Sequence, residues 1–225
     1  MCTEITEIVA IDGPAGAGKS SVGRCAAQRL GFAFLDTGAM YRAATWWAIH
    51  NSADLDDPEA LADVTARMPL DMTDEDGTLR IRAGEHDITS AIRTPEITRQ
   101  IYKLDHVPGV RAHLVELQRA FGARKPTVAE GRDMGTVVFP KAKWKIYLDA
   151  SVEERVRRRA TQLAANGAEV DTAALKREIE ERDHKNMTRA VSPLRRASDA
   201  RLLDTSDLTF DEVVGAIVNI VQEEA

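Results

Sequence analysis

A glycine-rich stretch near the N-terminus constrains the fold of this chain more than any other feature. Residues 13–20 read GPAGAGKS and fit the pattern G-x-x-x-x-G-K-[ST], the P-loop. The run IVAID at 8–12 predicts a short buried strand before it, and residues 19–30 have the apolar spacing of a helix after it. A strand, a glycine loop and a helix in this order are the context in which the pattern binds a nucleoside triphosphate.

The residue types of the P-loop suit a chain of phosphates. Glycines let the backbone bend around an anion with several N–H groups pointing inward, and the helix N-terminus adds about half a positive charge. Lys19 would reach the β- and γ-phosphates, and the hydroxyl of Ser20 would bind Mg²⁺. The residues expected to bind the triphosphate are Gly13, Pro14, Ala15, Gly16, Ala17, Gly18, Lys19, Ser20 and Ser21.

Composition narrows the class of protein further. A chain of 225 residues fits one domain or a core with insertions, and the net charge of −6 disfavours a general nucleic-acid binder, which needs a basic surface. Two cysteines disfavour a disulfide or metal framework. The sequence has neither a signal-peptide pattern nor an apolar run as long as a membrane span. We expect a cytoplasmic monomer without nucleic-acid or membrane partners.

Strand and helix patterns alternate along most of the chain, which predicts a parallel sheet flanked by helices. Further strands are expected at 32–35, 127–129, 145–149 and 201–204, with helices at 38–50, 95–104, 108–123 and 172–184. Two more helices are expected to begin with capping boxes, at Ser151 and at Thr209. The dipeptide at 166–167, Asn-Gly, should end the first of these two helices.

Residues 54–93 break this alternation. Pro58 marks the start of a short helix, and two strand patterns at 70–73 and 78–83 flank the turn sequence DEDG. The simplest account is a small α+β insertion in a parallel-sheet core.

Arginines recur on segments that should face the P-loop. A guanidinium group binds phosphate through two parallel hydrogen bonds and never loses its charge, so it can neutralise charge throughout phosphoryl transfer. These arginines are Arg42, Arg111, Arg132, the group from Arg155 to Arg159, Arg182 and Arg189. A solvated helix face is the simpler interpretation for Arg157, Arg177, Arg195 and Arg196.

Two aspartates, Asp36 and Asp133, follow predicted core strands. The carboxyl ends of parallel strands are where ligands bind, although both residues also suit ordinary turns. The five histidines are scattered and lack the spacing of metal ligands, so the only metal expected is Mg²⁺ carried with the triphosphate and held by Ser20.

Several runs of the sequence together resemble the bacterial cytidylate kinases. They are IDGPAGAGKS at 11–20, LDTGAMYR at 35–42, IRTPEI at 92–97, EGRDMGTVVFP at 130–140, KIYLDAS at 145–151 and LDTS at 203–206. The resemblance covers essentially the whole chain, and the run at 131–140 is its most diagnostic part. It implies a P-loop parallel sheet flanked by helices, with a small α+β monophosphate-binding insertion and a helical lid.

The resemblance implies an activity and a division of the chain. The implied reaction transfers the γ-phosphoryl group of ATP to CMP or dCMP, which gives CDP or dCDP and ADP. The P-loop core would comprise residues 1–38, 94–154 and 171–225, the monophosphate-binding insertion residues 39–93, and the lid residues 155–170.

The resemblance also implies roles for single residues. The acceptor site would contain Thr37, Tyr41, Arg42, Arg111, Arg132, Asp133, Arg182 and Arg189, and Arg155, Arg158 and Arg159 would belong to the lid over ATP. We count Asp36, Tyr102 and Asn186 with the acceptor site as well. The residues expected to act directly in catalysis are Lys19, Arg132, Arg155, Arg158 and Arg159.

Two positions depart from the family pattern. The family usually has aspartate at the place of Asn186 and serine at the place of Tyr102, both near the cytidine base and sugar. For Asn186, the alternative is a position on the solvent side of its helix. The preference among pyrimidine monophosphates is therefore open at this stage.

Two rival functions also remain open. One is a P-loop kinase for another small acceptor, such as a different nucleotide or a sugar acid. The other is a nucleotide-dependent switch without transfer activity, which the arginine-rich segment after Ser151 disfavours. An acceptor screen with ATP and Mg²⁺ discriminates between cytidylate kinase activity and these two rivals.

Overall fold

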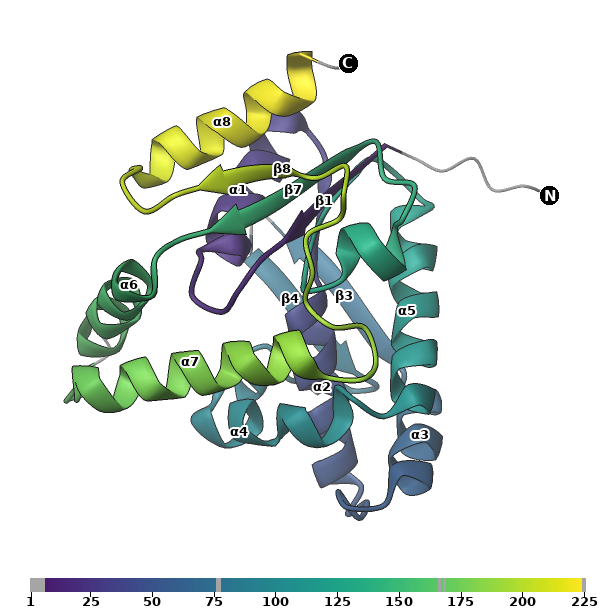
Figure 1. Cartoon of the computed structure of the whole chain (residues 1–225). Helices are drawn as coiled ribbons and strands as arrows, with labels where there is room; N and C mark the ends of the chain where they lie inside the picture. Colours follow the sequence, from purple (N-terminus) through teal and green to yellow (C-terminus); the bar gives the residue numbers. More distant parts are fainter. Residues whose placement is uncertain (1–6, 76–77, 166, 168, 224–225) are drawn as a thin grey trace.

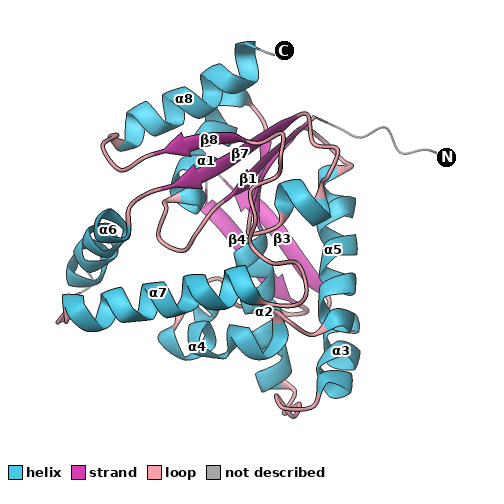
Figure 2. Cartoon of the chain, viewed as in Figure 1, coloured by secondary structure: helices cyan, strands magenta, loops and turns pink. Residues whose placement is uncertain are grey.

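The computed structural model describes residues 7–75, 78–165, 167 and 169–223, and its main sheet has five parallel strands in the order β2-β6-β1-β7-β8. The central strand β1 (Ile8–Asp12) lies between β6 (Thr127–Glu130) and β7 (Trp144–Asp149). The edges are β2 (Ala33–Asp36) and β8 (Arg201–Asp204). Figure 2 shows β8, β7 and β1 side by side. This architecture confirms the predicted α/β class.

Helices cover both faces of this sheet (Figure 1) because successive side chains of β1 point to opposite sides. On one side, Val9 and Ile11 pack with α1 (Lys19–Leu30) and α8 (Phe210–Glu223). On the other side, residues of α2 (Thr37–His50) and α5 (Pro108–Gly122) complete a larger apolar cluster. Burial on both faces explains why the central strands read as continuous apolar runs.

The insertion is built on a second sheet of three antiparallel strands, in the order β3-β4-β5. Its elements are α3 (Pro58–Ala66), β3 (Leu70–Glu75), β4 (Thr78–Ala83), β5 (His86–Asp87) and the short 3-10 helix η1 (Ala91–Arg93). The sequence predicted α3, β3 and β4 but neither β5 nor η1. The middle of the predicted turn, residues 76–77, lies outside the described residues.

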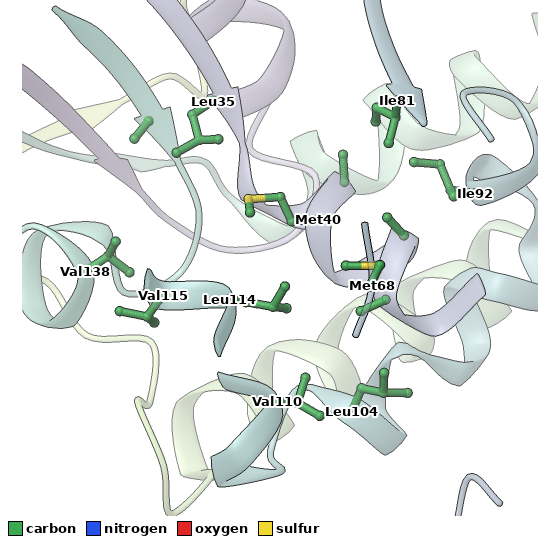
Figure 3. Packing of buried hydrophobic residues seen from close by; sticks show 14 of the residues in the cluster. Leu35, Met40, Met68, Ile81, Ile92, Leu104, Val110, Leu114, Val115 and Val138 are labelled. Atoms are coloured by element: carbon green, nitrogen blue, oxygen red, sulfur yellow. The ribbon is translucent and has the colours of Figure 1, made fainter. Parts of the chain in front are cut away.

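One continuous apolar cluster joins this insertion to the main sheet. Met68 and Ile81 of the insertion pack in the same cluster as Leu35 of β2 and Met40 of α2 (Figure 3). The cluster also takes in residues of α4 (Pro95–Leu104) and α5. Shared packing of this kind fixes the insertion against the carboxyl ends of the strands, because close-packed interiors transmit displacements rather than absorb them.

Two further helices, α6 (Val152–Ala165) and α7 (Thr172–Thr188), pack on each other through a small cluster of their own, Val156 with Leu175 and Ile179. Figure 1 shows α7 crossing near α2 and α4, on the side where the P-loop leaves β1. α7 extends one turn beyond the predicted end at residue 184. Of the predicted break at 166–167, residue 166 lies outside the described residues, and Gly167 has a left-handed φ of 79°.

The capping predictions differ in outcome. The box at Thr209 is complete, since Thr209 N donates to Glu212 Oε2 at 2.8 Å and Glu212 N donates to Thr209 Oγ1 at 3.4 Å. Of the capping box predicted at Ser151, only one of the two hydrogen bonds forms. Glu154 N donates to Ser151 Oγ at 3.2 Å, but Ser151 N donates to Ser206 Oγ, and the Glu154 carboxylate pairs with Arg157 and Arg158 instead.

The segment after β6 forms a π-helical turn, η2 (Met134–Val138), that the sequence did not predict. Its i to i+5 hydrogen bonds run from Val138 N to Asp133 O at 3.1 Å and from Phe139 N to Met134 O at 2.7 Å. Turns of this kind are rare and occur mostly at functional sites.

No helix of the described residues is both long and apolar enough to cross a membrane.

The close approach of Gly13 to β7 yields a stability test. A Cβ at position 13 would lie 2.0 Å from the backbone oxygen of Leu148, and φ there is +150°. Gly13→Ala should therefore lower the free energy of unfolding by about 2 kcal/mol or more, because neither backbone can yield without disturbing the sheet. Urea denaturation measures this.

Gly215→Ala is the matched control. This glycine lies within α8, and a Cβ there meets nothing within 4 Å. Its replacement should leave stability unchanged or raise it by up to about 1 kcal/mol. Equal destabilisation by the two substitutions would contradict the proposed role of Gly13.

Candidate active site

The P-loop connects β1 to α1 in the way that the sequence predicted. Gly16 and Gly18 have left-handed φ values of 80° and 89°, and Gly18 is the N-cap of α1. The Lys19 side chain turns back over the loop and donates to Pro14 O at 2.7 Å, with only 5% of the residue exposed. The predicted phosphate-binding groups therefore converge on one short stretch of backbone.

The surroundings of Lys19 disfavour the charged form of its side chain. Burial, followed by the nearby guanidinium of Arg132, lowers the pKa of Lys19 to about 7, against an opposing effect of Glu130. A polyanionic ligand would restore the charge by adding negative potential beside it.

Glu130 is a buried carboxylate at the end of β6, and sequence reasoning did not select it. Ser20 Oγ donates to Glu130 Oε1 at 2.7 Å, and Thr37 Oγ1 donates to the backbone oxygen of Glu130 at 2.7 Å. Burial and the neighbouring Asp36 raise the pKa of this carboxyl. Its position after strand residues 127–129, directly before Gly131-Arg132-Asp133, was the available signal.

Asp12 is a second buried carboxylate that sequence reasoning missed. It accepts hydrogen bonds from Met134 N at 2.7 Å and from Gly135 N at 2.8 Å. Burial raises the pKa of Asp12 to about 6 in spite of these two bonds. The end of β1 is thereby tied to the start of η2, at the segment that carries Arg132 and Asp133.

Arg111 and Asp133 form a buried ion pair, Nη2 to Oδ2, at this same edge of the sheet. The guanidinium of Arg111 also donates to Asp105 O at 3.2 Å and lies 5.6 Å from the ring centre of Tyr41. Arg189, at the end of α7, pairs with Asp105 at 3.6 Å. The structure thus brings together four predicted acceptor-site residues, and it adds Asp105.

Asp36 has two contacts at the start of α2. It accepts from Ala39 N at 2.7 Å, as a helix cap, and it pairs with Arg42 at 3.4 Å. Asp36 is therefore the N-cap of α2, a role that the sequence did not predict, and the same carboxylate also pairs with a predicted phosphate-binding arginine.

Three polar atoms of predicted acceptor-site residues are buried and have no hydrogen-bond partner within the described part of the chain. They are Tyr41 Oη, Arg42 Nε and Asn186 Nδ2. Asn186 is 9% exposed, so the alternative that it lies on the solvent side of α7 is wrong. Because buried polar groups are normally paired, these three atoms are available to a polar ligand.

Tyr102 has a different environment. It is 53% exposed on α4, and the ammonium groups of Lys103 and Lys185 lie 5.5 and 5.9 Å from its ring centre. Lys185 belongs to α7, so Tyr102 lies beside the helix that carries Asn186.

The remaining predicted arginines lie either near the P-loop and α2 (Arg132 and Arg182) or on α6 (Arg155, Arg158 and Arg159). Arg132 donates to Gly13 O at 3.1 Å. Loss of hydration around the Arg182 guanidinium group, followed by the effect of the nearby Arg132 and Arg42, lowers the pKa of Arg182 to about 10. Arg158 binds Thr205, with Nη1 to Oγ1 at 3.1 Å, whereas the exposed Arg159 binds Gln162. Arg155 is buried and is bound by protein groups of the P-loop and of α7.

This fold and the loop at this edge of the sheet define a P-loop nucleotide-binding protein. The cytidylate kinase family model matches residues 9–223, and the chain belongs to that family. This finding confirms the resemblance drawn from the sequence runs.

Individual relatives of known name support membership of this family. The chain is 45% identical to a cytidylate kinase of Carboxydothermus hydrogenoformans over 95% of this chain and 96% of that one. It is 48% identical to a cytidylate kinase of Rhodococcus jostii over 96% and 95% of the two chains. It is also 48% identical to a bifunctional pantoate ligase/cytidylate kinase of Synechococcus sp. strain JA-3-3Ab, of which it spans 41%.

The depressed pKa of Lys19 predicts proton uptake when ATP binds. At about pH 8 a lysine with a pKa of about 7 is mostly neutral in the free protein, and bound phosphates raise that pKa, so binding should take up close to one proton. Calorimetric titration with ATP in buffers of different ionisation enthalpy measures the number of protons.

Two variants calibrate this titration. Lys19→Met should abolish the uptake, whereas Lys143→Met, at a surface lysine paired with Glu7, should retain it. Equal proton uptake by the wild type and by Lys19→Met would contradict the assignment to Lys19.

Proposed function

We propose that this chain transfers the γ-phosphoryl group of ATP to CMP or dCMP, forming ADP and CDP or dCDP. The observation that carries the proposal is the pair of hydrogen bonds from Met134 N and Gly135 N to Asp12. They join the P-loop strand to the segment that holds Arg132 and Asp133, so a triphosphate site and an acceptor site share one edge of the sheet. Cytoplasmic location and a monomeric state stay predictions.

Charge neutralisation is the main chemical task of these residues. Phosphoryl transfer involves little covalent chemistry by the protein, and catalysis depends on positioning and electrostatic stabilisation. Lys19 and the P-loop N–H groups would hold the donor phosphates. Arg132, bound to Gly13 O, would stand between donor and acceptor, with Arg42 and Arg182 nearby.

The donor set beside the P-loop fits a magnesium ion, which prefers oxygen ligands and keeps several waters. The hydroxyl of Ser20 donates a hydrogen bond to Glu130, which leaves the lone pairs of the Ser20 oxygen for a cation. Asp36 lies close enough to Glu130 to raise the pKa of the Glu130 carboxyl, and a divalent cation would relieve this repulsion. We propose that Ser20 holds Mg²⁺, which would supply positive charge to the phosphates when bound.

The acceptor base would bind at the Arg111–Asp133 pair. A carboxylate accepts a hydrogen bond from the exocyclic amine of cytosine, whereas uracil offers a carbonyl that repels it. Tyr41 Oη and Asn186 Nδ2 are buried and unpaired among the described residues, so a nucleotide can satisfy them. Asn186 lacks the charge of the aspartate usual in the family, and its contact with the sugar would be weaker.

We propose that residues 39–93 act as the monophosphate-binding insertion and residues 155–170 as a lid. Two observations support this division. The apolar side chains of α6 pack against α7 in a small cluster and do not join the clusters on the two faces of the main sheet. The exposed Arg159 and the partly buried Arg158 lie on α6, where they are available to a bound triphosphate after a small movement. A lid would exclude water, which otherwise accepts the phosphoryl group.

An acceptor panel tests the function directly. ADP release with ATP and Mg²⁺ should be fast with CMP and dCMP and slow with UMP, AMP and GMP. Lys19→Met should lower turnover with CMP by about 10³-fold, since loss of a preorganised charge raises the barrier by roughly 4 kcal/mol. Preference for another acceptor would favour the rival kinase, and no acceptor-dependent release would favour a switch.

Asp133→Asn tests base recognition. It should narrow the ratio of kcat/KM between CMP and UMP by on the order of tenfold, because an amide can face either base. The KM for ATP should stay near the wild-type value, and thermal melting checks that the variant is folded. An unchanged ratio would remove Asp133 from base recognition.

A further inference from the structure

A buried ion pair links the helices α6 and α7 to the P-loop. Arg155 of α6 and Asp183 of α7 are only 5% and 7% exposed, and Arg155 Nη1 pairs with Asp183 Oδ2. The other carboxylate oxygen, Oδ1, accepts from Ala15 N at 3.2 Å, while Arg155 Nη1 also donates to Ala15 O at 3.0 Å. Both peptide groups of Ala15 are therefore held by charged side chains.

The backbone between β7 and α6 completes this contact. Arg155 Nε donates to Ala150 O at 3.0 Å, and a Cβ on Gly16 would lie 3.3 Å from Arg155 Cβ. The Arg155 side chain thus lies directly against the loop, and its guanidinium donates to Ala15 O, Ala150 O and Asp183. This arrangement differs from that of Arg159, which is exposed and contacts Gln162 of its own helix.

These contacts limit the conformations that the P-loop can adopt. A glycine-rich loop loses much conformational entropy when it takes up one shape, and a phosphate site requires N–H groups that already point inward. A buried ion pair stabilises such a shape only when its remaining hydrogen-bonding groups are satisfied, as they are here by Ala15 and Ala150.

We propose that Asp183 is a positioning residue: together with Arg155 it clamps Ala15 and holds the P-loop in its triphosphate-binding shape before nucleotide arrives. Arg155 acts in this account by bracing the loop. The same helix α7 carries Asn186 and Arg182 of the acceptor side, so the clamp also ties the loop to the helix that faces the acceptor. The inference rests on triphosphate binding by the P-loop and not on the identity of the acceptor.

A competing account predicts the opposite change in ATP affinity when Asp183 is replaced. A carboxylate on Ala15 N occupies a donor that a phosphate oxygen would also accept from, so Asp183 could instead obstruct ATP. Removal of an obstructing group tightens ATP binding, whereas removal of a positioning group weakens it.

Equilibrium binding of ATP, measured by calorimetry without acceptor, decides between these accounts. Asp183→Ala should raise the Kd for ATP by about tenfold or more, since a charged hydrogen bond and its partner are lost. Asp183→Asn keeps an acceptor for Ala15 N and should have a smaller effect in the same direction. Glu181→Gln, at an exposed carboxylate of α7 paired with Lys185, should bind ATP as the wild type does.

Amide hydrogen exchange of the wild type without nucleotide provides a test that needs no variant. The Ala15 amide should exchange slowly, and in Asp183→Asn it should exchange faster while the amides of β1 keep their protection. An unprotected Ala15 amide in the wild type would overturn the proposal. An unchanged or lowered Kd for ATP in both Asp183 variants would overturn it too, whatever the acceptor panel shows.

Discussion

The rest of the site depends on the two hydrogen bonds that the Asp12 carboxylate accepts. These two bonds, from Met134 N and Gly135 N, cross from the end of β1 to the start of η2. The bonds oppose the burial that raises the pKa of Asp12 to about 6, so they keep a carboxylate in a place that disfavours charge. They fix the spacing between the P-loop and the Arg111–Asp133 pair within the rigid sheet.

The parts outside the sheet are held in two different ways. The insertion shares one apolar cluster with β2, α2 and α5, so its position follows from packing. The α6–α7 pair has only a small cluster of its own and is attached to the P-loop by charge, through Arg155 and Asp183. Apolar contact therefore positions the small antiparallel sheet and its helices, whereas a satisfied ion pair connects α6 and α7 to the P-loop.

The sequence was informative wherever a signal is local. The P-loop pattern, the prolines at the starts of α3, α4 and α5, and the alternating strand runs predicted the elements and the order in which they occur. Local patterns could not predict contacts between distant residues. Ser20 meets Glu130 across 110 positions and Ala15 meets Asp183 across 168, so no periodicity links them. The sequence indicated that Arg155 lies in the helix after Ser151, but it gave no sign that its partner lies on α7.

The central claim is that donor and acceptor sites share one edge of the sheet and are held there by Asp12. A crystal structure with CMP, Mg²⁺ and a non-hydrolysable ATP analogue tests it most directly. The account predicts the γ-phosphate beside Lys19 and the cytosine amine within about 3 Å of the Asp133 carboxylate, with the CMP phosphate among Arg42, Arg132 and Arg182. Cytosine bound away from Arg111 and Asp133, with the γ-phosphate still at Lys19, would contradict it.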